Sequence, residues 1–173
     1  MKMDYTLEIV DRMSLEEMKG VLKVNKENLY VNGGTLHYDG ILRHDYAVLA
    51  KSGERVIAYT LLCESFITKK DMYVMQIAVA NDYKNAGIGS QMYKYIYNHL
   101  KGYKLFTANV NPKNTASKAF HAKNNFELTG RNGLGLLYIR KVKRDAKLRP
   151  SAAKKETFTC TVKDSQADLG PSL

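Results

Sequence analysis

Residues 72–100 switch from a two-residue to a helical hydrophobic repeat, and this switch constrains the fold most strongly. Met72 to Ala80 alternates as a β-strand does, and Ile88 to Leu100 carries apolar residues at helical spacing. A short turn containing Gly87 and Gly89 joins the two segments. The strand alternation predicts one shared face for four side chains, those of Tyr73, Met75, Ile77 and Val79. A strand that enters a helix through so short a turn predicts an α/β architecture.

The rest of the chain supplies more strands and helices in a mixed order. Ser14 and Glu17 form a capping box at the start of a helix expected to reach Asn28. A second core helix is predicted at 114–123, and a short helix fits within 32–45. Further strands are predicted at 5–10, 46–51, 55–64, 105–110, 126–130 and 136–142. We therefore expect a mixed α/β (α+β) domain with a mostly antiparallel sheet of about seven strands.

Length and composition indicate one intracellular domain. The chain has 173 residues, of which 45% are apolar, enough for a hydrophobic core. The longest apolar run, Val56 to Cys63, is too short to cross a bilayer, and no secretion signal is recognised. Two cysteines give no disulfide framework, and His37 and His44 lack a third metal ligand. We expect a cytoplasmic protein, without a metal, that is a monomer or homodimer.

The net charge of +10 is concentrated near the C-terminus. Residues 140–155 are rich in lysine and arginine, which is compatible with nucleic-acid binding. Few aromatic residues lie among these charges, so a solvated tail is favoured over a nucleic-acid surface. We therefore predict a folded domain at 1–142 and a basic, flexible tail at 143–173. Within the tail, Thr157 to Val162 alternates and is compatible with an added edge strand.

The turn before the helix at Ile88 has the chemistry of an anion site. The first amides of a helix have no partner within the helix, and the helix dipole adds positive potential. Gly87 and Gly89 leave room for a ligand to approach the backbone, and Lys84 adds a positive charge at the rim. A Walker phosphate loop is excluded because no Gly-Lys-Ser/Thr occurs, and Met92 replaces the third glycine of a Rossmann fingerprint. A tight turn that binds nothing remains the alternative.

Two segments together resemble the GNAT N-acetyltransferase superfamily. Lys84 to Gly89 resembles its Gln/Arg-x-x-Gly-x-Gly/Ala signature, with lysine at the first position, which loses the bidentate geometry of arginine. Asn114 to Phe126 resembles its Asn-x-x-Ala-x-x-x-Tyr-x-x-x-Gly-Phe element. In that element Ser117 stands for alanine and His121 for tyrosine, while Asn125 replaces glycine.

The resemblance implies a sheet that splays between its two central strands, with acetyl-coenzyme A as cosubstrate. Its pantetheine arm would pair with the strand before the signature, and its pyrophosphate would lie on the turn. The implied cofactor-binding residues are Ile77, Ala78, Val79, Lys84, Asn85, Ala86, Gly87, Ile88, Gly89, Ser90, Asn114 and Ser117. The implied reaction is direct attack of a primary amine, of a small molecule or a protein, on the thioester.

The resemblance also implies candidates for proton transfer. His121 stands where the family tyrosine protonates the leaving thiolate, although a surface histidine is the alternative. Glu64 is the candidate base, acting through a water, and an uninvolved strand-end carboxylate is its alternative. The Val79 amide is the expected oxyanion donor.

Two further functions stay open at the level of the sequence. One is an acetyltransferase that reaches an RNA- or ribosome-associated amine through the basic tail. The other is a regulatory module that binds acyl-coenzyme A without turnover. The acceptor pocket is expected from the variable segments 32–45 and 131–135.

Overall fold

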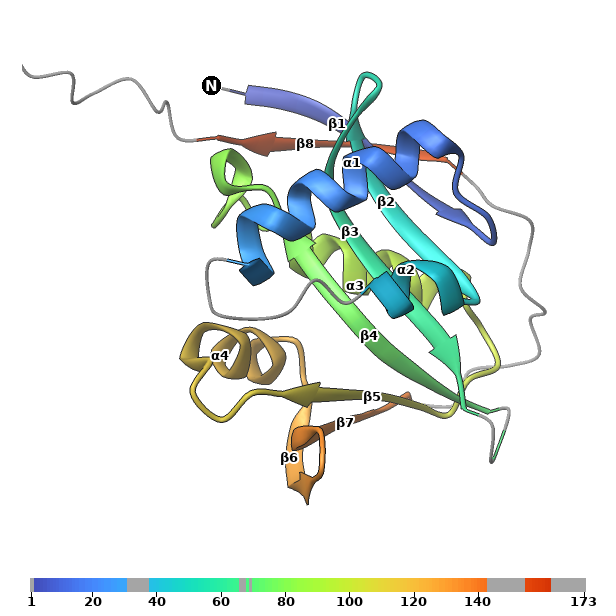
Figure 1. The fold of residues 1–173 in the computed structure, drawn as a ribbon, viewed down its shortest axis with the longest axis vertical. Coiled ribbons are helices and arrows are strands. Elements are labelled where there is room, and N and C mark those ends of the chain that lie inside the picture. Colours follow the sequence, from blue (N-terminus) through green and yellow to red (C-terminus); the bar gives the residue numbers. More distant parts are fainter. Residues whose placement is uncertain (1, 31–37, 66–67, 69, 143–154, 163–173) are drawn as a thin grey trace, which may run out of the picture.

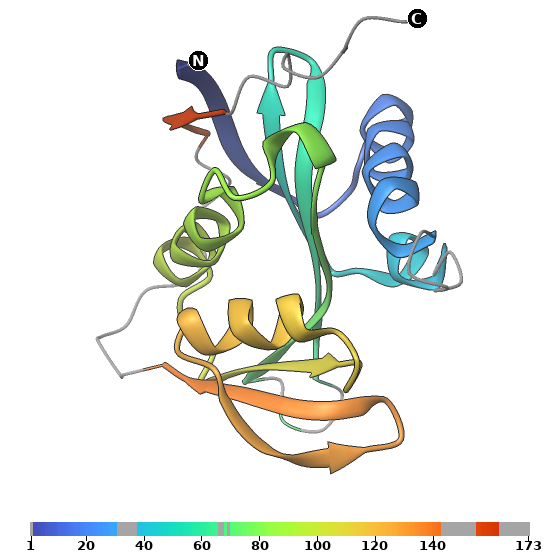
Figure 2. The same ribbon diagram turned by 90° about the vertical axis from the view of Figure 1, so that its left-hand side faces the viewer.

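The computed structural model describes residues 2–30, 38–65, 68, 70–142 and 155–162, which build one eight-stranded sheet with helices on both faces (Figures 1 and 2). The strands are β1 (Lys2–Val10), β2 (Tyr46–Ser52), β3 (Arg55–Glu64), β4 (Asp71–Val79), β5 (Leu105–Val110), β6 (Glu127–Asn132), β7 (Gly135–Lys141) and β8 (Glu156–Thr161). The helices are α1 (Leu15–Asn25), α2 (Tyr38–Arg43), α3 (Ile88–His99) and α4 (Thr115–Lys123), with a π-helix η1 (Lys26–Tyr30) and a 3₁₀-helix η2 (Asn81–Tyr83).

The strand order is β6-β7-β5-β4-β3-β2-β1-β8, and β4–β5 is the parallel pair in an otherwise antiparallel sheet. Helices α1 and α2 cover one face and α3 covers the other (Figure 2). The predicted mixed α/β fold with a mostly antiparallel sheet is confirmed, and one strand more than expected is present.

Strands β4 and β5 separate halfway along their length (Figure 1). They pair only where Asp71 to Val74 lies beside Leu105 to Ala108. Beyond that point β4 continues along β3, and β5 continues along β7. The predicted splay between the two central strands is therefore confirmed.

A β-bulge marks the point of separation. Leu62 lies opposite Val74 and Leu61 opposite Gln76, so Met75 is an extra residue in β4. Met75 consequently packs with the core beneath α1, whereas Ile77 and Val79 pack with the core beneath α3. The prediction that one face is shared by Tyr73, Met75, Ile77 and Val79 is wrong, because one inserted residue reverses the alternation.

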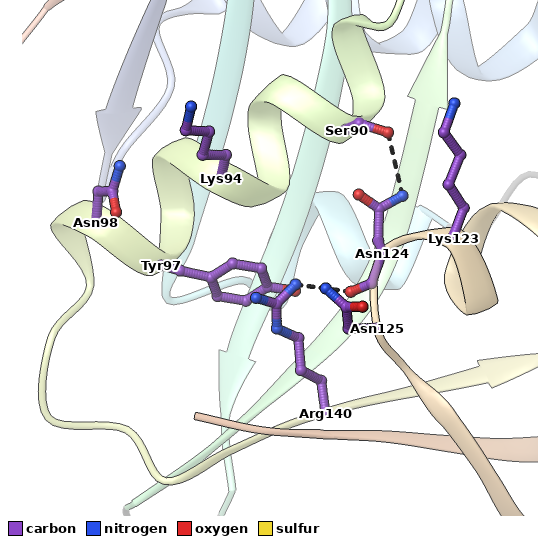
Figure 3. A pocket seen from close by; sticks show the side chains of 8 residues that line it. All are labelled: Ser90, Lys94, Tyr97, Asn98, Lys123, Asn124, Asn125 and Arg140. Carbon is purple, nitrogen blue, oxygen red and sulfur yellow. Dashed lines mark hydrogen bonds between the residues drawn. The ribbon is translucent and has the colours of Figure 1, made fainter. Parts of the chain in front are cut away.

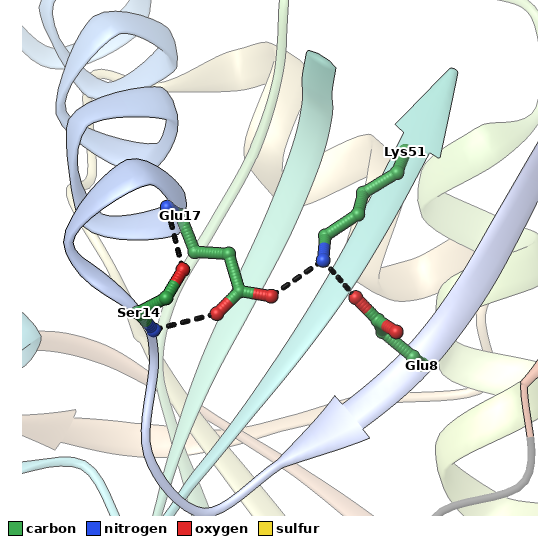
Figure 4. Close-up of polar contacts among 4 residues, drawn as sticks. All are labelled: Glu8, Ser14, Glu17 and Lys51. Carbon is green, nitrogen blue, oxygen red and sulfur yellow. Dashed lines mark hydrogen bonds and ion pairs between the residues drawn. The ribbon is translucent and has the colours of Figure 1, made fainter. Parts of the chain in front are cut away.

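The predicted capping box is present at the start of α1 (Figure 4). The Ser14 backbone amide donates to the Glu17 carboxylate at 2.6 Å, and the Glu17 amide donates to Ser14 Oγ at 3.2 Å. The other Glu17 oxygen pairs with Lys51 on β2, which also pairs with Glu8 on β1. Burial opposes ionisation of Glu17, but its hydrogen bonds with Lys51 and Ser14 outweigh burial and lower its pKa.

The folded domain extends beyond the boundary predicted at residue 142. Strand β8 pairs antiparallel with β1, and its Phe158 contacts Tyr5 of β1 and Tyr95 of α3. The part of the predicted flexible tail at 156–161 is therefore a strand, as the alternation from Thr157 indicated. Most of the basic segment 140–155 lies in residues 143–154, outside the described residues.

Candidate functional site

The turn after β4 uses two residues in the left-handed region. Gly87 precedes the first residue of α3 with φ of 82°, a conformation that favours glycine. Asn85 has φ of 64°, which asparagine tolerates better than most residues. A Cβ at Gly87 would meet no protein atom within 4 Å, so within the protein the positive φ is what favours glycine there.

Glycine at position 89 is favoured for a different physical reason. A Cβ on Gly89 would lie 3.0 Å from Cε2 of Phe120 on α4, so glycine lets α3 and α4 approach closely. The expectation that both glycines also clear space for a ligand stays a prediction. Gly87 shapes the turn, and Gly89 fits the helix contact.

Main-chain amides at this turn are free to bind a ligand. Within the described residues, the N–H groups of Asn85, Gly87, Ile88, Gly89 and Ser90 have no hydrogen-bond partner. The Ala86 amide makes a long bond of 3.4 Å to the Tyr83 carbonyl. Lys84 is exposed beside them. The turn is thus a cluster of donors at a helix N-terminus, which favours an anion.

Where β4 has separated from β5, alternate residues of β4 direct their main-chain groups away from β3. The Ala80 amide donates to the Ile57 carbonyl, so alternate residues of β4 bond β3 and those between them face the other way. Ala78 therefore faces Tyr59 of β3, while the main-chain groups of Ile77 and Val79 face the side from which β5 has departed. Of the three residues expected to pair with an extended ligand, two have the required orientation.

Helix η1 contributes contacts that the sequence analysis missed. Asn28 Nδ2 donates to the Val79 carbonyl at 2.9 Å, and the Glu27 carboxylate accepts from the Asn81 amide at 2.9 Å. A plain α-helix was expected to Asn28, but the chain becomes a π-helix after Asn25. Such a π-turn is common at functional sites, and here it fixes the end of β4 from the α1 side.

A buried polar cluster lies beside the bulge. Asn25 Nδ2 donates to Tyr59 Oη at 2.7 Å and to Gln76 Oε1 at 3.1 Å, and Tyr59 Oη donates to the same Gln76 oxygen at 3.0 Å. Asn25 is fully buried, and burial raises the pKa of Tyr59 to about 12. The cluster is uncharged, and it joins α1, β3 and β4 where β4 leaves β5.

The N-terminus of α4 carries the two other predicted cofactor residues. Asn114 Oδ1 caps the helix by accepting from the Ser117 amide at 2.9 Å. The far end of α4 lies against the start of α3, because Asn124 Nδ2 donates to Ser90 Oγ at 3.2 Å. The fold therefore links the two motifs that the sequence analysis identified.

His121 is buried between α3 and α4 with both ring nitrogens bonded. Nδ1 lies 2.8 Å from the Ser117 carbonyl, which only accepts, so Nδ1 carries the proton. Nε2 lies 3.1 Å from Tyr93 Oη and therefore accepts from that hydroxyl. Burial lowers the pKa of His121. Proton donation by His121 stays a prediction, and this geometry weighs against it.

Glu64 lies at the other end of the sheet from the turn. It sits opposite Met72, whereas the turn follows Val79 at the far end of β4. Its carboxylate accepts from the Tyr103 hydroxyl, and its backbone amide donates to Asp45. A role for Glu64 as base stays a prediction that nothing in this arrangement favours.

Two further features of the described residues bear on other classes of site. No group of three or more histidine, cysteine, aspartate or glutamate side chains is placed to hold a metal ion in the described ranges. No helix in the same part of the chain is long and apolar enough to cross a membrane.

Solved structures share this fold at low sequence identity. One is the PaiA N-acetyltransferase of Thermoplasma acidophilum in complex with coenzyme A (16% identity, TM-score 0.63, 79% of this chain and 99% of that chain covered). An acetyltransferase from Thermus thermophilus has 20% identity and a TM-score of 0.65, with 79% and 97% covered. A GNAT family acetyltransferase from Elizabethkingia anophelis with acetyl-CoA bound has 16% identity and a TM-score of 0.60, with 80% and 98% covered. No curated protein sequence matches the chain.

The model of the acetyltransferase (GNAT) family matches residues 20–126, more than half of the chain. The match includes the bulged strand β4, the turn with its free amides, α3 and α4. It therefore covers the whole site described above. This protein belongs to the GNAT acetyltransferase family and is an acyltransferase.

Proposed function

We propose that the protein transfers an acetyl group from acetyl-coenzyme A to a primary amine, on a small molecule or a protein, by direct attack on the thioester. The observation that carries this proposal is the continuity of two features. The outward backbone of β4 at Ile77 and Val79 leads directly into the free amides of Asn85 to Ser90. A ligand with an extended arm that ends in a diphosphate would pair first with the β4 main chain and then with the amides of the turn.

Each part of the cofactor then has proposed partners. The pantetheine amides pair with Ile77 and Val79, and the diphosphate accepts from the turn, with Lys84 adding charge at the rim. Ala78 contributes through its position in β4, because its main chain bonds β3. Asn114 and Ser117, at the start of α4, line the arm near the thiol. Two of the similar solved proteins are described with coenzyme A or acetyl-CoA bound.

The Val79 amide is the proposed oxyanion donor. It faces the same side as the Val79 carbonyl, which Asn28 holds at 2.9 Å. Asn28 thus holds the Val79–Ala80 peptide unit, which adjoins the Ala78–Val79 unit that carries the proposed donor. A preorganised donor of this kind stabilises the charge that develops on the thioester oxygen.

We propose structural roles for the two predicted proton-transfer residues. His121 holds Tyr93 between α3 and α4, and Glu64 holds Tyr103 at the far end of the sheet. The attacking amine then arrives neutral and forms the C–N bond, its extra proton passes to water, and the C–S bond breaks so that the thiolate leaves without a side-chain acid. A coenzyme A thiol that titrates near the free cysteine value of about 8.5 makes an unaided departure feasible at neutral pH.

The test combines titration calorimetry with an assay of thiol release. We expect the full chain to bind coenzyme A and to release it from acetyl-coenzyme A when a panel of small amines and lysine peptides is added. Gly87→Val, which forces a β-branched residue into the left-handed region, should abolish binding. Gly53→Val, at a positive φ in the β2–β3 turn with open space around it, is the matched control. Absence of heat with coenzyme A would overturn the proposal, and binding without turnover would contradict its catalytic part.

A further inference from the structure

The fork that β4 and β5 form where their pairing ends, beyond Val74 and Ala108, has two faces with different surroundings. On one face α3 and α4 pack against each other and against β7. Asn124 Nδ2 donates to Ser90 Oγ, and the Asn124 carbonyl accepts from Arg140 at 2.6 Å (Figure 3). Protein fills this face, so we expect an amine to reach the fork from the other face, which α1 borders.

The side chains on the α1 face of the fork are polar and uncharged. Gln76 is one of the first residues of β4 past the fork, and its Oε1 accepts from Asn25 at 3.1 Å and from Tyr59 at 3.0 Å. Tyr73 comes directly before the fork, and Gln76 and Tyr73 are both half-buried. Burial raises the pKa of both tyrosines, so their hydroxyls are neutral near pH 7.

Asn25 contributes a buried acceptor to this face. Its Nδ2 serves Tyr59 and Gln76, whereas its Oδ1 is buried and has no hydrogen-bond partner among the residues that the structure describes. An unpaired buried acceptor costs about 1–3 kcal/mol, which a donor that enters the cluster would recover. The cluster therefore suits a small N–H or O–H donor.

A neutral, partly buried lining discriminates between the two protonation states of an amine. Transfer of an ammonium group out of water is costly unless an opposite charge lies nearby, so uncharged surroundings favour the neutral amine. An α-amino group titrates near pH 8, and about a third of it is neutral at pH 7.5. A lysine side chain titrates near pH 10.4, and only about 0.1% of it is neutral. The two neutral fractions thus differ roughly 250-fold.

We propose that the acceptor is a weakly basic primary amine, the α-amino group of an amino acid or peptide, and that lysine side chains and polyamines are poor substrates. The inference rests on the proposed function, because it names the amine that this reaction uses. The neutral nitrogen forms the C–N bond to the acyl carbon and the C–S bond breaks. One amine proton passes to water, and the sulfur leaves as the thiolate.

The experiment measures thiol release from acetyl-coenzyme A with two peptides of one sequence. One peptide has a free N-terminus and no lysine, and the other has a blocked N-terminus and a single lysine. At pH 7.5 the wild type should show a kcat/KM at least roughly thirtyfold higher for the α-amine, because the more nucleophilic lysine nitrogen offsets part of the difference in neutral fraction. Between pH 7 and 9 the value should rise about tenfold per pH unit for the lysine peptide, and level off above pH 8 for the other.

A carboxylate placed at the fork should weaken this preference. Gln76→Glu puts it opposite two donors, Asn25 Nδ2 and the Tyr59 hydroxyl, which favour the ionised form. The new charge can hold an ammonium group and take its proton, so the ratio of the two kcat/KM values should fall roughly tenfold. Gln91→Glu, the same chemical change on half-buried α3, is the matched control and should preserve the wild-type ratio.

The outcomes separate this inference from the proposed function. Equal values of kcat/KM for the two peptides in the wild type, or a preference for lysine, would overturn the substrate class while leaving acetyl transfer intact. The same pH profile for both peptides would also overturn it, because the amine would then not set the profile. Absence of thiol release with both peptides and with every amine of the panel would instead overturn the proposed function.

Discussion

The last turns of α3 and α4 each hold a histidine in the same local geometry, and the two rings differ in their tertiary partners. His99 Nδ1 and His121 Nδ1 both lie 2.8 Å from the carbonyl four residues earlier, Tyr95 and Ser117 respectively. The difference lies at Nε2. His99 meets the Glu156 carboxylate at 2.9 Å, whereas His121 meets the Tyr93 hydroxyl at 3.1 Å.

The two Nε2 partners differ in hydrogen-bond chemistry. A carbonyl and a carboxylate both only accept, so both ring nitrogens of His99 face acceptors. The Tyr93 hydroxyl can donate, so His121 needs only one proton and stays neutral in its buried site. The tertiary partner at Nε2, and not the helix position, therefore decides what each histidine can do.

Removal of the His121 ring is expected to have the largest effect in this comparison. His121→Phe leaves the buried Tyr93 hydroxyl without its partner, which should lower the free energy of unfolding by about 2 kcal/mol. Urea denaturation measures this loss, and His99→Gln, at the half-exposed pair, is the smaller reference change. In the thiol-release assay the variant should retain the pH profile of kcat/KM. A fall in kcat of a hundredfold or more with unchanged stability would instead show that His121 delivers a proton.

The next largest effect is expected when the pH is lowered, because His121 is neutral in the folded protein. Burial lowers the pKa of His121 below its ordinary value of 6.5, so the unfolded chain binds more protons between the two values. The free energy of unfolding should therefore fall as pH drops below 6.5, by at most about 1.4 kcal/mol per pH unit for one group. Denaturation curves between pH 7.5 and 5 measure this slope. The slope should be shallower in His121→Phe, and identical slopes would contradict a neutral buried ring.

The sequence predicted those features that depend on neighbours along the chain. The switch from strand to helix between Met72 and Leu100 is visible in hydrophobic period, and the capping box at Ser14 is visible in four residues. The alternation from Thr157 likewise indicated β8. Each of these is a local pattern, so no knowledge of the tertiary structure was needed to predict it.

Features that depend on distant partners were not predictable in the same way. The bulge at Met75 appears only when β4 is aligned with β3, and the Asn25 cluster joins residues 34 and 51 positions apart. The partner of His121 is 28 positions away on another helix. From the sequence alone, a histidine in place of the family tyrosine favoured an acid role for His121. The buried contact with Tyr93 does not support that role.

Glu17 also makes the free energy of unfolding depend on pH, in a pH range that differs from that of His121. Its pKa lies below its ordinary value of 4.5, so its contribution is present above that value and lost as pH falls through the folded-state pKa. Glu17→Gln keeps an acceptor for the capping box but loses the charge that faces Lys51, at a cost of about 1 kcal/mol near neutral pH. Denaturation curves should approach those of the wild type below pH 4.5, while the slope near pH 6 stays unchanged. A changed slope near pH 6 would show that the two groups are coupled.

The smallest effect is expected at the contact between His99 and Glu156. Glu156→Gln keeps an acceptor opposite His99 Nε2 and removes only the ionic part of the contact, in which the Glu156 side chain is 44% exposed. Water screens such a pair, so the loss should be about 0.5 kcal/mol and should decrease with added salt. Hydrogen exchange of the β8 amides measures it most directly, because His99 and Glu156 connect β8 to α3. Glu127→Gln on exposed β6 is the matched control and should leave β8 exchange unchanged. Protection of β8 that is unaffected by Glu156→Gln at low salt would mean that Phe158 packing alone holds the strand, and the carboxylate partner of His99 would then have no consequence for stability.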